Sequence, residues 1–178
     1  MSEQQSSLIG NILAWWGGLP NQRAERALLR RAHSLTAIEL CPAYHRAYQQ
    51  ICAGLSDSEA EKIQVARRTS KLALTLGVLV HVQGTATSEG RQQSGKCTAI
   101  AAMNAKKGEG NTVSELRFLR LLESPNPESL FAGMRRVVPL LGEDIDIANF
   151  ARSLLYWGGK VKKDWAYAYD WPDHKSNN

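Results

Sequence analysis

The chain has 178 residues, a length typical of one domain that closes around a single core. Its composition, with 43% hydrophobic residues and five tryptophans, is that of a globular protein rather than a disordered one, and no apolar run is long enough for a membrane span. Lysine and arginine total 22 against 17 acidic residues, so the net charge of +5 is compatible with an anionic partner without identifying one.

The amino-terminal residues and the cysteines indicate where the protein works. Residues 1–7 contain no lysine or arginine, and the apolar run after them is interrupted by Asn11, so we expect no signal peptide. Cys41, Cys52 and Cys97 are odd in number and far apart, which is typical of reduced thiols rather than of disulfides or a zinc site. We therefore expect a cytoplasmic protein.

Two amphipathic helices are expected at the start of the chain. Residues 8–16 have one apolar face and end at a pair of glycines. A second helix follows Pro20, with Asn21 as its N-cap. Its inward-facing residues are predicted to be Ala24, Ala27, Leu28 and Ala32.

Two longer helices are expected next. One covers 42–51 and begins with a proline. A capping box formed by Ser58 and Glu61 begins the other, over 59–76. The β-branched residues that follow could also form a strand, but no second strand-like run lies near enough to pair with it. We therefore expect the helix to continue to about His81.

Residues 83–96 are small and polar and show no periodicity, which predicts a long flexible loop. We expect a single all-helical domain over 1–178, in which 1–82 and 97–170 form two small sub-bundles joined by this loop. The expected fold class is all-α, a compact bundle of about eight or nine helices.

Five helices are expected after the loop. Lys106 and Lys107 are predicted to end the first of them, where cations suit the helix dipole. The expected start signals of the others are a Thr112–Glu115 capping box, Asn126 before a proline, Asp144 or Asp146, and the glycine pair at 158–159. Their predicted core residues are Leu116, Leu119, Leu122, Leu130, Met134, Val137, Val138, Leu141, Ile147, Phe150, Leu154 and Trp157.

No motif for catalysis or metal binding is present in the sequence. The two acidic pairs, 59/61 and 144/146, lie at predicted helix starts, where carboxylates accept from free backbone N–H groups. The four histidines lack the spacing of a helical metal pair, and neither a nucleophile elbow nor a phosphate-binding loop occurs. We therefore expect no enzyme activity and no cofactor.

Four basic clusters lie on predicted helices whose other side is apolar. They are Arg23, Arg26, Arg30 and Arg31; Arg117 and Arg120; Arg135 and Arg136; and Lys160, Lys162 and Lys163. One such cluster is usually a solvated helix face, but four together favour a surface that binds nucleic-acid backbones, because each neutralised phosphate releases counterions. No helix combines asparagine, glutamine and arginine as a base-reading helix does. We predict phosphate contacts without sequence preference.

Several segments resemble a known family when they are taken in order. They are 29–32 (Leu-Arg-Arg-Ala), 113–122 (Val-Ser-Glu-Leu-Arg-Phe-Leu-Arg-Leu-Leu), 134–137 (Met-Arg-Arg-Val), 145–157 (ending Leu-Leu-Tyr-Trp) and 160–167 (Lys-Val-Lys-Lys-Asp-Trp-Ala-Tyr). Together with the opening helix that ends in tryptophan, they are similar to the CasB family, the small subunit of the type I-E CRISPR Cascade complex. The similarity spans nearly the whole chain.

The resemblance implies two small helical bundles, a non-catalytic role and head-to-tail association of copies inside the complex. In that family the subunit helps to hold the guide RNA and the target DNA, particularly the displaced strand, and so stabilises the R-loop. It also bridges the large subunit and the backbone subunits. R-loop exchange is nearly balanced in base-pairing energy, so modest backbone contacts can shift it.

Four positions match basic residues of the family pattern: Arg31, Arg117, Arg136 and Lys160. The chain departs from the pattern before residue 113, where many relatives have Gly-Arg-Ala-Leu and this chain has no arginine. Either the lysines at 96, 106 and 107 replace that contact, or the contact is missing.

Two other functions fit the same residues. A structural adaptor would use the basic clusters to contact acidic protein surfaces, and substitution of Trp157 or Trp165 would then disrupt assembly. A free-standing helical DNA-binding regulator would bind a duplex alone and prefer one sequence. A gel shift with the isolated chain, with and without competitor DNA, separates the regulator from the other two.

Overall fold

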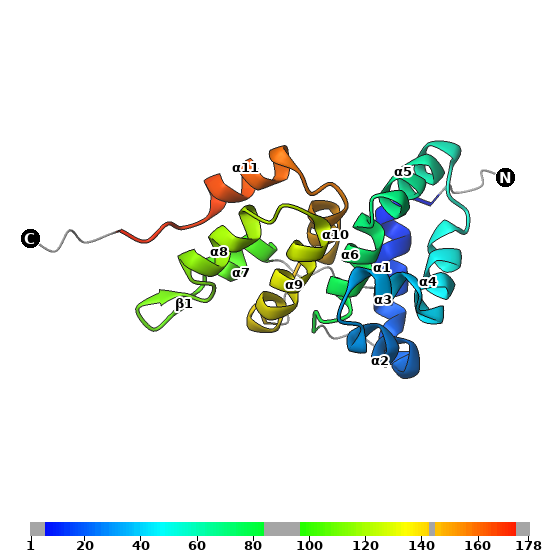
Figure 1. The fold of residues 1–178 in the computed structure, drawn as a ribbon, viewed down its shortest axis with the longest axis horizontal. Helices are drawn as coiled ribbons and strands as arrows, with labels where there is room; N and C mark the ends of the chain where they lie inside the picture. The colour runs from blue at the N-terminus through cyan, green and yellow to red at the C-terminus, as the bar shows by residue number, and fades with distance from the viewer. Residues whose placement is uncertain (1–5, 84–96, 143–144, 174–178) are drawn as a thin grey trace, which may run out of the picture.

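The computed structural model describes residues 6–83, 97–142 and 145–173. These residues form eleven α-helices, two short 3-10 helices and one two-stranded hairpin (Figure 1), which confirms the predicted all-α class. Nine of the described α-helices have seven residues or more. None of them is long and apolar enough to cross a membrane.

The first half of the chain folds around the helix α6. Its elements are α1 (Leu8–Gly18), η1 (Leu19–Asn21), α2 (Arg23–Arg31), α3 (Leu35–Glu39), α4 (Pro42–Cys52), α5 (Asp57–Arg68) and α6 (Lys71–Leu79). Every residue of α6 from Leu72 onward is buried, because α3, α5, α9 and α10 all pack on it. Helix α1 packs on α4, α5 and α10. The prediction of helix rather than strand before His81 is confirmed, although α6 ends at Leu79.

Helix α2 differs from its prediction in both its start and its buried face. Asn21 belongs to η1, and Gln22 is the N-cap instead. Leu29 is the buried residue of α2, whereas Leu28 is 40% exposed and Ala24 is exposed. The contacts of α2 with α4 and η1 decide which face is buried. The sequence pattern of such a short, arginine-rich helix does not identify that face.

The predicted helix over 59–76 is two helices. Ser56, not Ser58, caps α5, because its hydroxyl accepts the N–H of Glu59. Thr69 follows the last residue of α5, and its hydroxyl donates a hydrogen bond to the Val65 carbonyl at 2.9 Å. Ser70 then adopts a left-handed conformation with φ of 56°, and the chain turns into α6.

The second half contains α7 (Ala99–Asn104), β1 (Lys106–Lys107), β2 (Gly110–Asn111), α8 (Glu115–Leu122), α9 (Pro127–Val137), η2 (Val138–Leu140), α10 (Ile147–Leu155) and α11 (Gly159–Ala168). The predicted caps Asn126 and Asp146 are confirmed, since each side chain accepts a backbone N–H three residues on. The predicted core residues of α9, η2 and α10 are buried, as is Trp157.

Two predictions near α8 are wrong, namely the residue that caps the helix and the position of the lysine pair before it. Ser114 is the N-cap of α8, while the Thr112 hydroxyl donates to the Ala105 carbonyl at 2.8 Å. Lys106 and Lys107 lie in the β1–β2 hairpin, which begins two residues after α7 ends. Two residues form the buried face of α8, Phe118 and Leu121, whereas the predicted Leu116 is 59% exposed and Leu119 and Leu122 are half-buried.

The helices of both halves share one core. Helices α9 and α10 pack on α6, and α10 also packs on α1, so the buried hydrophobic residues form one cluster across the two halves. The division into sub-bundles 1–82 and 97–170 stays a prediction. Of the expected loop 83–96, residues 84–96 lie outside the described part of the chain, as does Asp144.

Candidate nucleic-acid interface

Two of the predicted basic clusters, on α2 and α9, meet at the carboxyl end of α2. Arg135 of α9 joins His33 through a hydrogen bond from Nη1 to Nδ1 of 3.0 Å, and its Nη2 lies 3.5 Å from the Arg30 carbonyl oxygen. The Arg135 guanidinium also stacks over the Phe131 ring, 5.5 Å from its centroid. Arg135 therefore links α9 directly to α2, although 105 residues separate it from Arg30.

His81 lies beneath this junction. Burial and, to a smaller extent, the positive charges of Arg135, Arg30 and Arg26 together lower its pKa to about 4. His81 is therefore neutral at pH 7. The Nε2 atom of His81 and the Nε atom of Arg135 are buried and have no hydrogen-bond partner in the described part of the chain. Buried polar atoms normally have partners, so these two atoms leave the junction without its full set of hydrogen bonds.

Arg26 is the third arginine of the junction. Its Nε lies 3.4 Å from the Val80 carbonyl oxygen, which places the half-buried side chain against the end of α6. Burial and the neighbouring Arg30 lower the pKa of Arg26. The effect of Arg30 indicates that these two guanidinium groups lie near each other.

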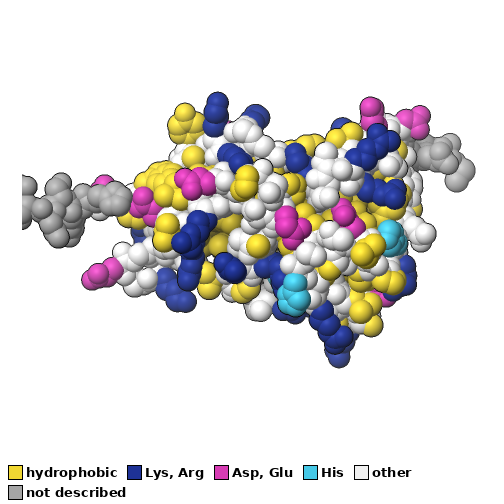
Figure 2. All heavy atoms as spheres, in the orientation of Figure 1, with side chains coloured by type: hydrophobic (Ala, Val, Ile, Leu, Met, Phe, Trp, Pro, Cys, Tyr) yellow, Lys and Arg dark blue, Asp and Glu magenta, His cyan; other side chains and the backbone are white. Residues whose placement is uncertain are grey.

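Most basic side chains of α2, α8 and α9 are exposed. Figure 2 shows lysine and arginine side chains in the lower half of the view, where α9 and α2 lie, and others in the upper half, over α11 and α5. We call the arginines of α2, α8 and α9 the basic band: Arg23, Arg26, Arg30, Arg31, Arg117, Arg120, Arg135 and Arg136. Except for the half-buried Arg26 and Arg135, they are exposed.

The ion pairs of the described residues lie outside the basic band. The described residues contain four ion pairs, and none of them includes an arginine of the band. Glu25, the acidic residue of α2, instead pairs with Arg46 of α4 at 2.7 Å. Within the described part of the chain, the arginines of the band therefore form no direct ion pair.

The predicted lysines of α11 have local partners. Lys160 pairs with Asp164 one turn further on, at 2.8 Å. The ammonium of Lys162 donates to the Ser124 carbonyl at 3.1 Å, just after the end of α8. Lys163 is exposed. The Lys162 contact ties α11 to the segment after α8, whereas the Lys160–Asp164 pair lies exposed on α11 itself.

A second basic site was missed by the sequence argument. Arg67 and Arg68 end α5 and line a pocket of about 550 Å³ with Tyr44 and Glu39. The sequence placed them inside a continuous helix, where an arginine pair is ordinary, and the break at Ser70 that opens the pocket has no local signal. In the described residues no group of His, Cys, Asp and Glu side chains could hold a metal ion.

Comparison with known proteins identifies the family of the chain. The model of the family "CRISPR-associated protein Cse2" matches residues 25–169, which include every predicted site residue except Arg23. The chain belongs to the Cse2 family. Membership implies a small subunit of Cascade in type I-E CRISPR defence, in a family that is structural and generally non-catalytic. Searches of curated proteins and of solved structures returned no match.

Proposed function

We propose that this Cse2-family subunit binds nucleic-acid backbones through the basic band and thereby stabilises the R-loop of a type I-E Cascade complex. The observation that supports this most directly is the junction of α2 and α9, where Arg26, Arg30 and Arg135 gather without a carboxylate partner among the described residues. Such crowding costs Coulomb energy in the free protein, and a bound phosphate relieves it. Arginine suits this role because its planar group binds phosphate through two parallel hydrogen bonds.

The displaced DNA strand is the ligand that the band fits best. A single strand needs a track of positive charge, which the arginines of α8, α9 and α2 supply. No base-reading helix accompanies the track, so binding by the basic band is indifferent to sequence. The guide RNA and the target strand are further partners in this proposal, together with the large subunit, the backbone subunits and a second copy of this chain.

Charge reversal in the assembled complex tests the proposal. The variants Arg31→Glu, Arg117→Glu and Arg136→Glu are made singly and together, since all three side chains are exposed and their loss removes no buried contact. Each lost phosphate contact is expected to lower the salt dependence of single-strand binding by about 0.7 in log–log slope. The readouts are DNA retention against salt concentration and the amount of subunit incorporated.

Arg152→Glu is the matched control, because it makes the same charge change at an exposed residue of α10, outside the basic band. Its complex should retain DNA like the wild type. Unchanged retention by the triple variant at moderate salt would refute the proposal. An equal loss in Arg152→Glu would show that net charge, rather than the band, is responsible. Poor incorporation with normal retention per assembled complex would favour a structural adaptor.

A further inference from the structure

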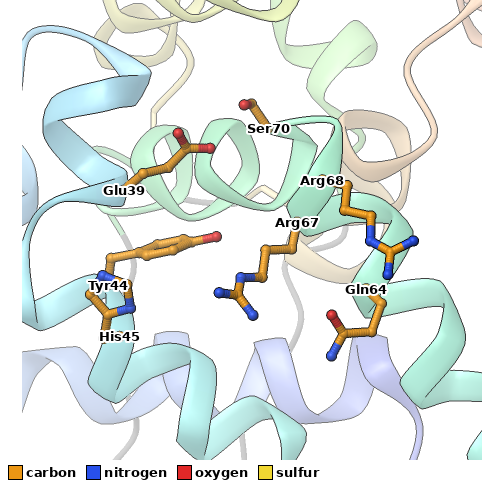
Figure 3. Close-up of a pocket in the computed structure, with 7 residues that line it drawn as sticks. All are labelled: Glu39, Tyr44, His45, Gln64, Arg67, Arg68 and Ser70. Atoms are coloured by element: carbon orange, nitrogen blue, oxygen red, sulfur yellow. The ribbon is translucent and has the colours of Figure 1, made fainter.

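The pocket between α3, α4, α5 and the start of α6 is separate from the basic band. It encloses about 550 Å³, within the range of roughly 300–1,000 Å³ that small-molecule sites occupy. Figure 3 shows Tyr44 and Glu39 on one side and Arg67, Arg68 and Gln64 on the other. The pocket therefore combines cations, a carboxylate and a hydroxyl within one cavity.

Tyr44 supplies the strongest sign that the pocket takes a ligand. Its side chain is only 2% exposed, and its hydroxyl is buried without a hydrogen-bond partner in the described part of the chain. In Figure 3 this hydroxyl points across the pocket toward Arg67. Burial, and then the charge of Glu39, raise the pKa of Tyr44, so the group stays a neutral donor and acceptor. Buried hydroxyls are rarely left unpaired, and a bound molecule would complete this one.

Neighbouring contacts fix the cationic side of the pocket. The Arg67 guanidinium stacks over the Tyr48 ring, 4.9 Å from its centroid, and the Tyr48 hydroxyl accepts the Gln64 amide N–H at 2.7 Å. The Gln64 amide oxygen is consequently available as an acceptor. Arg67 and Arg68 are exposed and take part in none of the ion pairs of the described residues.

The mixture of charges narrows the class of ligand. An acidic peptide side chain would fit the two arginines but would meet the Glu39 carboxylate, and a basic one would meet the arginines. A free phosphate would leave Glu39 and Tyr44 without a role. A nucleotide carries both an anionic group and hydrogen-bond donors on its base, so it matches both sides of the pocket.

We propose that this pocket binds one unpaired nucleotide of a nucleic-acid strand, with its phosphate at Arg67 and Arg68 and its base edge at Glu39 and Tyr44. Glu39 accepts hydrogen bonds only, so it favours a base that presents donors. Guanine presents two adjacent donors and is expected to bind most tightly. The proposal stands on the pocket alone and does not depend on the basic band.

Calorimetric titration of the full chain tests this assignment. The probes are the four nucleoside 5′-monophosphates, inorganic phosphate and a short glutamate-rich peptide. Guanosine monophosphate is expected to saturate the pocket, uridine monophosphate to bind more weakly, and inorganic phosphate and the peptide to bind at least tenfold more weakly than guanosine monophosphate. Binding of phosphate or peptide as tight as that of the nucleotides would overturn the proposal, as would the absence of saturation by any nucleotide at millimolar concentration.

Three variants locate the site. Tyr44→Phe removes only the unpaired hydroxyl, so the melting temperature should stay the same or rise while affinity falls about three- to tenfold. Arg67→Gln should lower the affinity for all four nucleotides, and Glu39→Gln should reduce the preference for guanosine monophosphate over the others. Arg152→Gln, on α10, is the matched control and should change none of these values. If Tyr44→Phe and Arg67→Gln bind like the wild type, the pocket is not the site.

A further variant distinguishes failure of this proposal from failure of the proposal that the basic band binds nucleic acid. The double variant Arg31→Glu with Arg136→Glu should bind guanosine monophosphate like the wild type, because both residues lie outside the pocket. Loss of nucleotide binding in that variant would assign the nucleotide to the band and overturn the pocket.

Discussion

His81 predicts an acid-sensitive step in the stability of the protein. The unfolded chain takes up the His81 proton near pH 6.5, whereas the folded chain does so only near pH 4. Between these values the unfolded state binds more protons than the folded state. The free energy of unfolding therefore falls as the pH drops through this window, and the His81 contribution levels off below it.

The size of the effect follows from the same environment. A histidine pKa that falls from 6.5 to about 4 corresponds to at most about 3 kcal/mol. His81 is only half-buried, so solvent screens the charges of Arg135, Arg30 and Arg26. We expect roughly 1–2 kcal/mol of lost stability between pH 7 and pH 4.5 that is due to this residue.

Urea unfolding at the two pH values measures this loss. Carboxylates also titrate in this range, so the comparison is with His81→Gln, which retains a polar side chain and cannot titrate. The wild type should lose about 1–2 kcal/mol more than His81→Gln between pH 7 and pH 4.5. Equal losses, or an NMR titration of His81 in the free chain near pH 6.5, would refute the reasoning.

The same titration reports on the basic band. A phosphate bound at Arg26, Arg30 and Arg135 offsets the positive charges that lower the His81 pKa. Adding a single-stranded oligonucleotide should therefore raise that pKa toward 6.5. A pKa that does not move at saturation would show that the phosphates bind elsewhere.

Two further substitutions test the packing that positions the site. Gly77→Ala should destabilise the protein by about 1–2 kcal/mol in thermal unfolding, since a Cβ would overlap the Ile38 side chain and lie 2.9 Å from Phe131, and this outweighs the gain in helix propensity. Gly159→Ala, whose Cβ would meet open space, should be neutral, and equal effects would contradict the packing argument. Tyr169→Phe should lower the free energy of unfolding by about 1–2 kcal/mol, because the buried Tyr169 hydroxyl donates to the Val113 carbonyl at 2.6 Å. Tyr167→Phe, at an 88% exposed residue, should leave it unchanged.

Some start signals could be predicted because they act within one turn of the helix. Asn126 and Asp146 accept the N–H of the residue three positions on, and such a contact is complete within four residues of sequence. The apolar stripe of α9 was equally clear, because Leu130, Met134 and Val137 repeat at helical spacing over about two turns.

Other local signals competed with one another, and the sequence alone could not rank them. Ser56 and Ser58 each precede a glutamate by three residues, so both fit a capping box, and the fold uses Ser56. The turn at Ser70 interrupts an unbroken helical pattern, because α6 must cross the core among α3, α9 and α10 to bury its apolar residues.

The helical class and the position of the arginines on amphipathic helices could be predicted from the sequence, because both depend on residues close together in the chain. The family resemblance could also be recognised there, because it depends on the order of segments along the chain. Which basic side chains lie near one another depends instead on how the helices pack. Arg135 reaches Arg30 and His33 because α9 and α3 pack on the same helix, α6. Lys160 and Lys162, equally basic in sequence, have partners within the fold. Each residue carries its charge in any fold, but a binding surface requires several charged side chains to lie close together. The packing of the helices sets the distances between those side chains.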